Sequence, residues 1–495
     1  MKHSVSKTDL DFDFSQGPDL SQYAVQFAKE RNSRTLTLRT KRPTIASVFG
    51  KNPASLRPSL VPDVSLFINP EYVIRTLSNG SAEEIKTTLS GLSTAVETST
   101  TIVSPITSSP EVAEAFCNAL ASTFPPDVIV SLLGTVGTLY PLSKEVQDAY
   151  IDNGLPFSLL NFLSIGIDEY PNWNLISSEV VSSTLDIIST IAANNFYGRN
   201  SLLCDGLIDP LIQIAQHSPF MDQACTCIFT IFNNPAPLES ESIMEVIPQI
   251  SSLLKLSSKT AVEQILLAYV CMTNKDTSIV SNLYDIELPT YVIPLLDDPD
   301  LIAVSLKVVG NLSVAQPPQI RIMLDLDLLG KLRSLLVSQP DYIPDIYWIL
   351  SNLVEAYSPA ILPTFDEEFL RTVLNHAREG EMETKKEATF FLSTVILFSH
   401  SDSYDKFMNP DVVGLLVQML ACDVGMIIFR CIDTILAFVR HMTSNPDSLD
   451  HGVATIFHTN IMDTLNELAK NDDPLLGERA AYLVDKLSEL SEIKE

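Results

Sequence analysis

The sequence predicts an all-α fold, a right-handed superhelical solenoid of about ten stacked repeats, preceded by a flexible N-terminal arm. Three observations carry this prediction. The 495-residue chain is 46% hydrophobic, which is enough for a large core. Its apolar residues recur at helical spacing, without strand alternation or a βαβ pattern. A short turn followed by an amphipathic helix returns several times along the chain.

Four of these helices place a leucine at the same point of the pattern, namely Leu159, Leu211, Leu332 and Leu415. Their spacings of 52, 121 and 83 residues correspond to one repeat with an insertion, three repeats and two repeats of about 40 residues. A longer apolar helix follows in several repeats. We therefore assign residues 61–490 to the solenoid, and residues 165–179, with Trp173, to an inserted loop.

Charge divides the chain near residue 60. Residues 1–60 hold ten Lys/Arg and five Asp/Glu, which leaves 22 cations and 56 acids for residues 61–495. Such an excess of acid repels nucleic acid and anionic membranes and attracts basic peptides. We expect no direct binding of nucleic acid, and an N-terminal arm that is disordered by itself.

Catalytic and metal-binding patterns are missing from the sequence. The seven cysteines include no CxxC, and Cys225 and Cys227 stand two apart, so that on a helix they point to different sides. We interpret the cysteines as reduced core thiols of a cytosolic or nuclear protein. No apolar run approaches the roughly 18 residues of a membrane span. We expect neither an enzyme nor a cofactor, a bound metal or membrane insertion.

Three segments resemble consecutive repeats of the importin-α family, the armadillo-repeat adaptors of nuclear import. They are SLKVVGNL (305–312), YWILSNL (347–353) and KKEATFFLSTV (385–395). Lys307 and Trp348 are 41 residues apart, and Trp348 and Phe390 are 42 apart, as the family's order requires. The resemblance covers residues 25–490 and is strongest after residue 300.

The resemblance implies a groove for nuclear-localisation peptides along the third helix of each repeat. Trp348 would form a wall for the stem of a Lys or Arg, Asn352 would bond the peptide backbone, and Asp345 would receive a cation. We expect Trp348 and Asn352 to face solvent. The alternative is that they are a core aromatic and a helix-packing amide. The flanking repeats keep the same spacing with Lys307, Asn311, Glu387, Phe390 and Thr394.

The repeats nearer the N-terminus depart from the family. The positions aligned with its tryptophans and asparagines are Asp186 and Thr190 in the third repeat, Thr226 and Thr230 in the fourth, and Gly134 and Thr138 in the second. The family's principal peptide site therefore lacks its aromatic slots here, and we expect an altered cargo preference or a weakened affinity.

The basic segment of the arm, about 25–52, resembles the importin-β-binding segment of the family; a disordered basic tail is the alternative. The resemblance implies an importin-β-like carrier, autoinhibition by this tethered segment, shuttling between cytoplasm and nucleus, and an export receptor at the C-terminal repeats. The alternative function is an armadillo-repeat interaction scaffold outside nuclear transport. The cations that would contact the carrier are Arg31, Arg34, Arg39, Lys41, Arg42 and Lys51.

Overall fold

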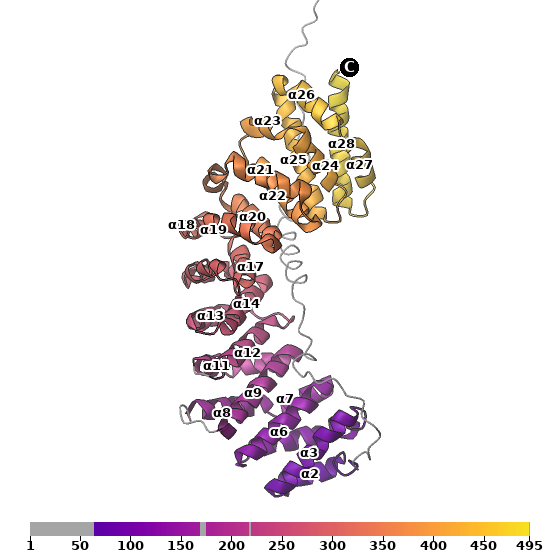
Figure 1. Cartoon of the computed structure of the whole chain (residues 1–495). Helices are drawn as coiled ribbons and strands as arrows, with labels where there is room; N and C mark the ends of the chain where they lie inside the picture. The colour runs from indigo at the N-terminus through magenta and orange to yellow at the C-terminus, as the bar shows by residue number, and fades with distance from the viewer. Residues whose placement is uncertain (1–63, 169–174, 217–218, 495) are drawn as a thin grey trace, which may run out of the picture. The chain divides into compact units, whose positions relative to one another are not determined.

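The structure, a computed structural model, describes residues 64–168, 175–216 and 219–494 (Figure 1). Helices and turns make up these residues, and no strand occurs among them. They fall into two compact units, 64–291 and 292–494, which are described separately. No helix of the described part is long and apolar enough to cross a membrane. The N-terminal arm, its basic segment and Trp173 lie outside the described residues.

In unit 64–291, five long helices pack in sequence, each against the next, and form the third helices of successive repeats. They are α3 (Ala82–Thr98), α6 (Pro126–Leu139), α9 (Leu175–Asn194), α12 (Met221–Asn233) and α14 (Lys259–Lys275). The second helices are α2 (Pro70–Asn79), α5 (Pro110–Leu120), α8 (Leu155–Asp168), α11 (Ile208–Ala215) and α13 (Ser240–Ile250). The remaining α-helices of the unit are α4 (Ser104–Thr107), α7 (Lys144–Asp152), α10 (Phe196–Cys204) and α15 (Val280–Asp285), with α16 (Leu288–Val292) at its end.

Unit 292–494 repeats this arrangement. Its third helices are α17 (Ile302–Leu312), α20 (Ile343–Ile361), α22 (Met382–Phe398), α25 (Gly425–Ser444) and α28 (Pro474–Lys494). Its second helices are α19 (Leu328–Ser338), α21 (Glu367–Glu379), α24 (Pro410–Met419) and α27 (Ile461–Leu468). The first helices are α18 (Pro317–Asp325), α23 (Tyr404–Phe407) and α26 (Pro446–Phe457). With five third helices in each unit, the described residues agree with the expected number of repeats.

The expected all-α solenoid is confirmed, and so is the repeat alignment by leucines. Leu159, Leu211, Leu332 and Leu415 lie on the second helices α8, α11, α19 and α24, and all four are buried. Each contributes about 1.5–3 kcal/mol by leaving water. The expected loop 165–179 is wrong at both ends, because α8 continues to Asp168 and α9 begins at Leu175. Ile165 and Ile167 extend the apolar pattern of α8, and Leu175 and Ile176 begin that of α9.

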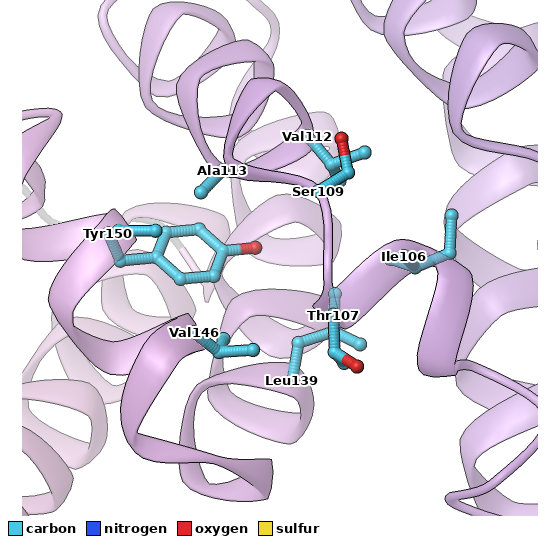
Figure 2. Close-up of a pocket in the computed structure, with 9 residues that line it drawn as sticks. Ile106, Thr107, Ser109, Val112, Ala113, Leu139, Val146 and Tyr150 are labelled. Atoms are coloured by element: carbon cyan, nitrogen blue, oxygen red, sulfur yellow. The ribbon is translucent and has the colours of Figure 1, made fainter.

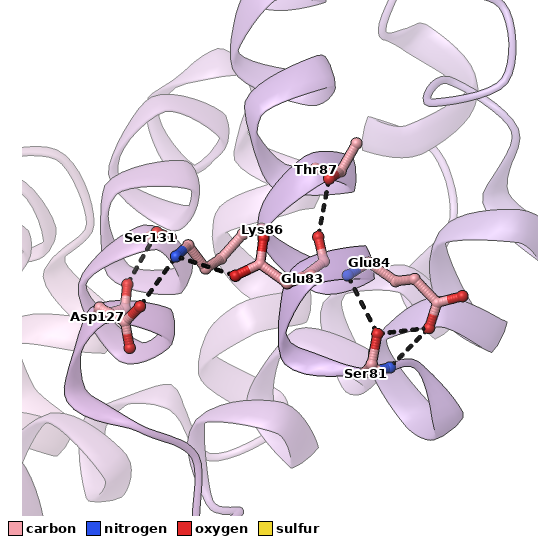
Figure 3. A network of polar contacts seen from close by, with 7 residues as sticks. All are labelled: Ser81, Glu83, Glu84, Lys86, Thr87, Asp127 and Ser131. Carbon is pink, nitrogen blue, oxygen red and sulfur yellow. Dashed lines mark hydrogen bonds and ion pairs between the residues drawn. The ribbon is translucent and has the colours of Figure 1, made fainter.

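Local sequence signals set the helix ends. The side chain of Asn69 accepts a hydrogen bond from the amide of Tyr72 and caps α2. Ser81 and Glu84 form a reciprocal capping box at the start of α3 (Figure 3). These contacts satisfy amides that have no partner inside the helix, so α2 and α3 begin at defined residues.

Two cations hold the loop 234–237 between α12 and α13. Arg199 of α10 is fully buried and donates from Nη1 to the carbonyl of Ala236 and from Nη2 to that of Pro237, both at 2.9 Å. Lys275, at the end of α14, donates from Nζ to the carbonyl of Asn234 at 2.5 Å. Burial, followed by repulsion from Arg199, lowers the pKa of Lys275 to about 8.

This lowered pKa makes stability depend on pH. The unfolded chain protonates Lys275 near its ordinary pKa of 10.5, whereas the folded protein does so near pH 8. Between these values the unfolded state binds more protons, so stability from this lysine rises with pH. Denaturant melts at pH 8 and pH 10 should therefore show that wild type gains free energy of unfolding relative to Lys275→Met. Lys144→Met, at an exposed lysine of α7, controls for the lost charge. A difference between wild type and Lys275→Met that is constant with pH would contradict the expectation.

Candidate peptide-binding surface

The three segments that carry the resemblance lie on consecutive third helices. Lys307 is on α17, Trp348 on α20 and Phe390 on α22, and each helix packs against the next. Positions that are 41 and 42 residues apart therefore lie on neighbouring third helices, in the order that the resemblance implies. Lys307 and Glu387 are half-buried, whereas Asn311, Asp345 and Thr394 are buried.

The expectation that Trp348 and Asn352 face solvent is wrong. Only 5% of Trp348 and 8% of Asn352 is exposed, and Phe390 is 1% exposed. The indole of Trp348 lies against Gly310 of α17, where an added Cβ would come within 1.9 Å of the ring. The absence of a side chain at Gly310 lets the indole approach the preceding helix this closely.

The amides and hydroxyls of these helices are engaged inside the repeats. Asn352 Nδ2 donates to Ser313 Oγ at 3.0 Å, just beyond the end of α17, and lies 3.5 Å from the carbonyl of Gly310. Thr394 Oγ1 donates to the carbonyl of Phe390 at 2.9 Å. These bonds agree with the alternative of a core aromatic and a helix-packing amide. The Asn352 amide bonds the preceding repeat and does not have the solvent-facing position that binding a peptide backbone requires.

The aligned positions in unit 64–291 are different, because they are exposed or half-buried and, apart from Gly134, polar. Their hydroxyls donate to carbonyls of their own helix: Thr190 Oγ1 bonds Asp186 O at 2.9 Å, and Thr230 Oγ1 bonds Thr226 O at 2.7 Å. The oxygen lone pairs remain available as acceptors. We call this surface the polar stripe. It comprises Glu83, Thr87, Ser90 and Thr94 of α3, Asp127, Ser131, Gly134 and Thr138 of α6, Glu179, Ser183, Asp186 and Thr190 of α9, Gln223, Thr226 and Thr230 of α12, and Gln264 of α14.

Acids lie toward the N-terminal end of the stripe on three helices. Glu83, Asp127 and Glu179 are exposed or half-buried, at the first or second turn of α3, α6 and α9. Lys86 Nζ lies 2.9 Å from Asp127 Oδ2 and links α3 to α6 (Figure 3). This bond lowers the pKa of the Asp127 carboxyl, so Asp127 carries its charge at neutral pH. The resulting edge is acidic.

A second link joins α9 to α12 within the stripe. Gln223 Nε2 donates to Asp186 Oδ1 at 2.7 Å and to the carbonyl of Ser182 at 3.0 Å. Burial raises the pKa of Asp186, and the bond from Gln223 opposes that shift. The resemblance to importin-α says of the repeat with Asp186 only that it lacks the aromatic side chain of the family.

The signal that could have revealed the stripe is the run of small polar residues at helical spacing on several third helices.

The described residues hold no cluster of metal ligands, and the cavity near α5 and α7 is too small for an organic ligand. No group of three or more His, Cys, Asp or Glu in the described residues could hold a metal ion. A cavity near α5 and α7 is lined by Ile106, Val112, Val146 and Tyr150 among others (Figure 2), and it has room for about one water molecule. Burial raises the pKa of Cys225 and Cys227 to about 12, so both thiols stay protonated and unreactive.

Comparison with known proteins shows the fold. No protein-family model and no curated protein matches the sequence. An engineered protein of a structural genomics consortium aligns with 85% of this chain and 98% of its own, at TM-score 0.65 and 15% identity. A structure from work on a phosphorylation switch between cadherin and β-catenin aligns over 86% and 96%, at TM-score 0.58 and 10% identity. A designed armadillo repeat protein covers 49% of this chain and 99% of its own, at TM-score 0.41 and 15% identity.

At these identities the likeness concerns architecture alone. The two long alignments, together with the ladder of third helices in each unit, define an all-α solenoid of armadillo type. Membership of the importin-α family does not follow from them.

The contact of Trp348 with Gly310 makes a stability prediction. Gly310→Ala places a methyl group against the indole and should lower the free energy of unfolding by about 1–3 kcal/mol. Gly414→Ala is the matched control in the same unit, because a Cβ at Gly414 of α24 meets nothing within 4 Å. It should instead raise stability by roughly 0.5–1 kcal/mol. Denaturant melts measure both, and equal effects of the two variants would show that the indole does not pack on Gly310.

Proposed function

We propose that the protein is a non-enzymatic scaffold that binds an extended, basic segment of a partner protein along the polar stripe. The observation that carries the proposal is the stripe itself, a row of exposed or half-buried hydroxyls, amides and acids on stacked third helices. The excess of acid in residues 61–495 supports the sign of the partner's charge. The structure aligned at TM-score 0.58 comes from work on an interaction between two proteins, cadherin and β-catenin, which supports the class of function.

The polar groups of the stripe are better suited to bind the main chain of a peptide than to form a slot for a Lys or Arg side chain. Hydroxyl oxygens such as those of Thr190 and Thr230 accept hydrogen bonds from peptide amides, and the amide of Gln264 offers both a donor and an acceptor. Glu83 and Glu179 pair with Lys or Arg heads, and exposed pairs contribute only about 0.2–1 kcal/mol each. Affinity is therefore built from several repeats, and no single residue dominates it.

This proposal predicts a local effect of acidic residues. Glu83→Gln/Glu179→Gln should weaken a labelled Lys/Arg-rich peptide by about threefold to tenfold, because two exposed ion pairs are lost. The loss should shrink as salt is added, since exposed charges are screened. Fluorescence anisotropy on the full chain measures it.

The matched control removes the same charge elsewhere in the unit. Glu114→Gln/Glu241→Gln changes two acids on the second helices α5 and α13. It should leave the affinity within about twofold of wild type, because long-range attraction between exposed charges is largely screened at physiological salt. If both pairs weaken the peptide equally, the attraction comes from net charge and the stripe is not the site.

A second candidate function is that of a nuclear import adaptor. The placement of Lys307, Trp348 and Phe390 on three consecutive third helices favours it, because the resemblance to importin-α requires that order. In this function the partners are nuclear-localisation peptides, an importin-β-like carrier for the basic segment and an export receptor at the C-terminal repeats. The protein would then shuttle between cytoplasm and nucleus.

The carrier distinguishes the two functions. An import adaptor should capture an importin-β carrier in a pull-down with the full chain, and Arg39→Glu/Lys41→Glu/Arg42→Glu should abolish the capture because the carrier reads these cations. If the protein is a scaffold outside nuclear transport, neither wild type nor the charge-reversal variant should capture the carrier. Binding that survives the charge reversal would separate the carrier from the basic segment and count against the resemblance.

A further inference from the structure

Arg430 of α25 reaches across two neighbouring third helices. Its guanidinium carbon lies 4.7 Å from the ring centroid of Phe390 on α22, and its Nη2 lies 2.5 Å from Glu355 Oε1 on α20. The Arg430 side chain is 22% exposed, and that of Glu355 is 37% exposed. Arg430 thus lies over the ring of Phe390 and also pairs with the carboxylate of Glu355.

These two contacts are the ones that would hold a cation from outside. An aromatic face attracts a guanidinium or ammonium group within about 6 Å of its centroid, and a carboxylate binds the head through charge-assisted hydrogen bonds. Phe390 and Glu355 supply both, from adjacent helices. Arg430 supplies the cation from the chain itself, on the third helix of the next repeat.

Other acidic residues of this unit also form ion pairs with Lys and Arg side chains of the same unit. Arg479 of α28 donates from Nε and Nη2 to Asp433 Oδ1, at 3.0 and 2.5 Å. Lys386 of α22 lies 2.7 Å from Asp423 Oδ1, just before α25. Compensation inside the unit is therefore a repeated feature of its third helices. Lys486 of α28 lies over Tyr482 of its own helix and pairs with Glu489, whereas Arg430 covers an aromatic ring of a neighbouring third helix.

We propose that Phe390 and Glu355 form a cation slot that Arg430 fills, so that this face rejects a Lys or Arg side chain of a partner. A segment that crosses α22 would carry an uncharged or acidic residue there. The inference goes beyond the scaffold function, because it concerns unit 292–494 and not the polar stripe.

The first test uses ethylguanidinium as a substitute for the missing side chain. Arg430→Ala should gain thermal stability when ethylguanidinium is added, whereas wild type should not. Arg371→Ala removes an exposed cation from α21 and serves as the charge-matched control. Arg430→Ala/Glu355→Gln should lose the gain, because the slot then lacks its carboxylate. Since each shift is read against the same variant without the additive, a lower starting stability does not obscure it.

The second test measures exclusion. A labelled Lys/Arg-rich peptide should bind Arg430→Ala about tenfold more tightly than wild type, as one cation–π slot with a carboxylate becomes available. Arg430→Lys should bind like wild type, because a cation still fills the slot.

The outcomes separate this inference from the scaffold proposal. Equal peptide affinities of Arg430→Ala, Arg371→Ala and wild type, or no selective effect of ethylguanidinium, would overturn the slot. Failure of wild type to bind the peptide would instead count against the polar stripe, and the ethylguanidinium shift would still decide whether the slot exists.

Discussion

The packing of each third helix against the next is the constraint on which both units depend. A single repeat is too small to bury its own apolar face, so its third helix is stable only between its neighbours. The contact of Trp348 with Gly310 shows how close this packing becomes, because the indole occupies space that a methyl group would need. Stability in such a stack is built from contacts between neighbouring repeats, and a change at one interface acts first on the two helices that meet there.

The same constraint appears in the hydrogen bonds between repeats. Asn234 Nδ2 donates to the carbonyl of Ala192, 42 residues earlier, at 2.7 Å, and Cys227 Sγ donates to Leu185 O over the same separation at 3.2 Å. Asn352 approaches Gly310 with an equal spacing. Polar side chains at these interfaces are thus used to fix the register of one helix on the next, which leaves fewer of them for a partner.

The contacts between repeats explain which features of the fold and of the candidate site could be predicted from the sequence. Periodicity shows which residues are equivalent in successive repeats, so the leucines at 159, 211, 332 and 415 were predicted correctly. By the same periodicity, Lys307, Trp348 and Phe390 lie on three consecutive third helices. Periodicity does not report which way an equivalent side chain turns, because that depends on what the preceding repeat offers. Gly310 offers a flat surface for Trp348, and Ser313 offers an oxygen to Asn352. The polar stripe escaped prediction for a related reason, since serine and threonine at helical spacing have no family signature and become a surface only when their helices are stacked.

The polar stripe and the face around Arg430 differ in what they leave for a partner, and charge compensation is the physical difference. In unit 292–494, Arg430 and Arg479 satisfy Glu355 and Asp433 from within, and a bound peptide would have to replace contacts that already exist. In unit 64–291, Glu83 lies 3.8 Å from Lys86, which bonds Asp127 more closely, so Glu83 is only weakly compensated. Because displacing an internal ion pair cancels most of what a new pair contributes, a basic partner gains more on the surface whose acids are less engaged. Selectivity between these two surfaces then follows from which charges the chain has already paired.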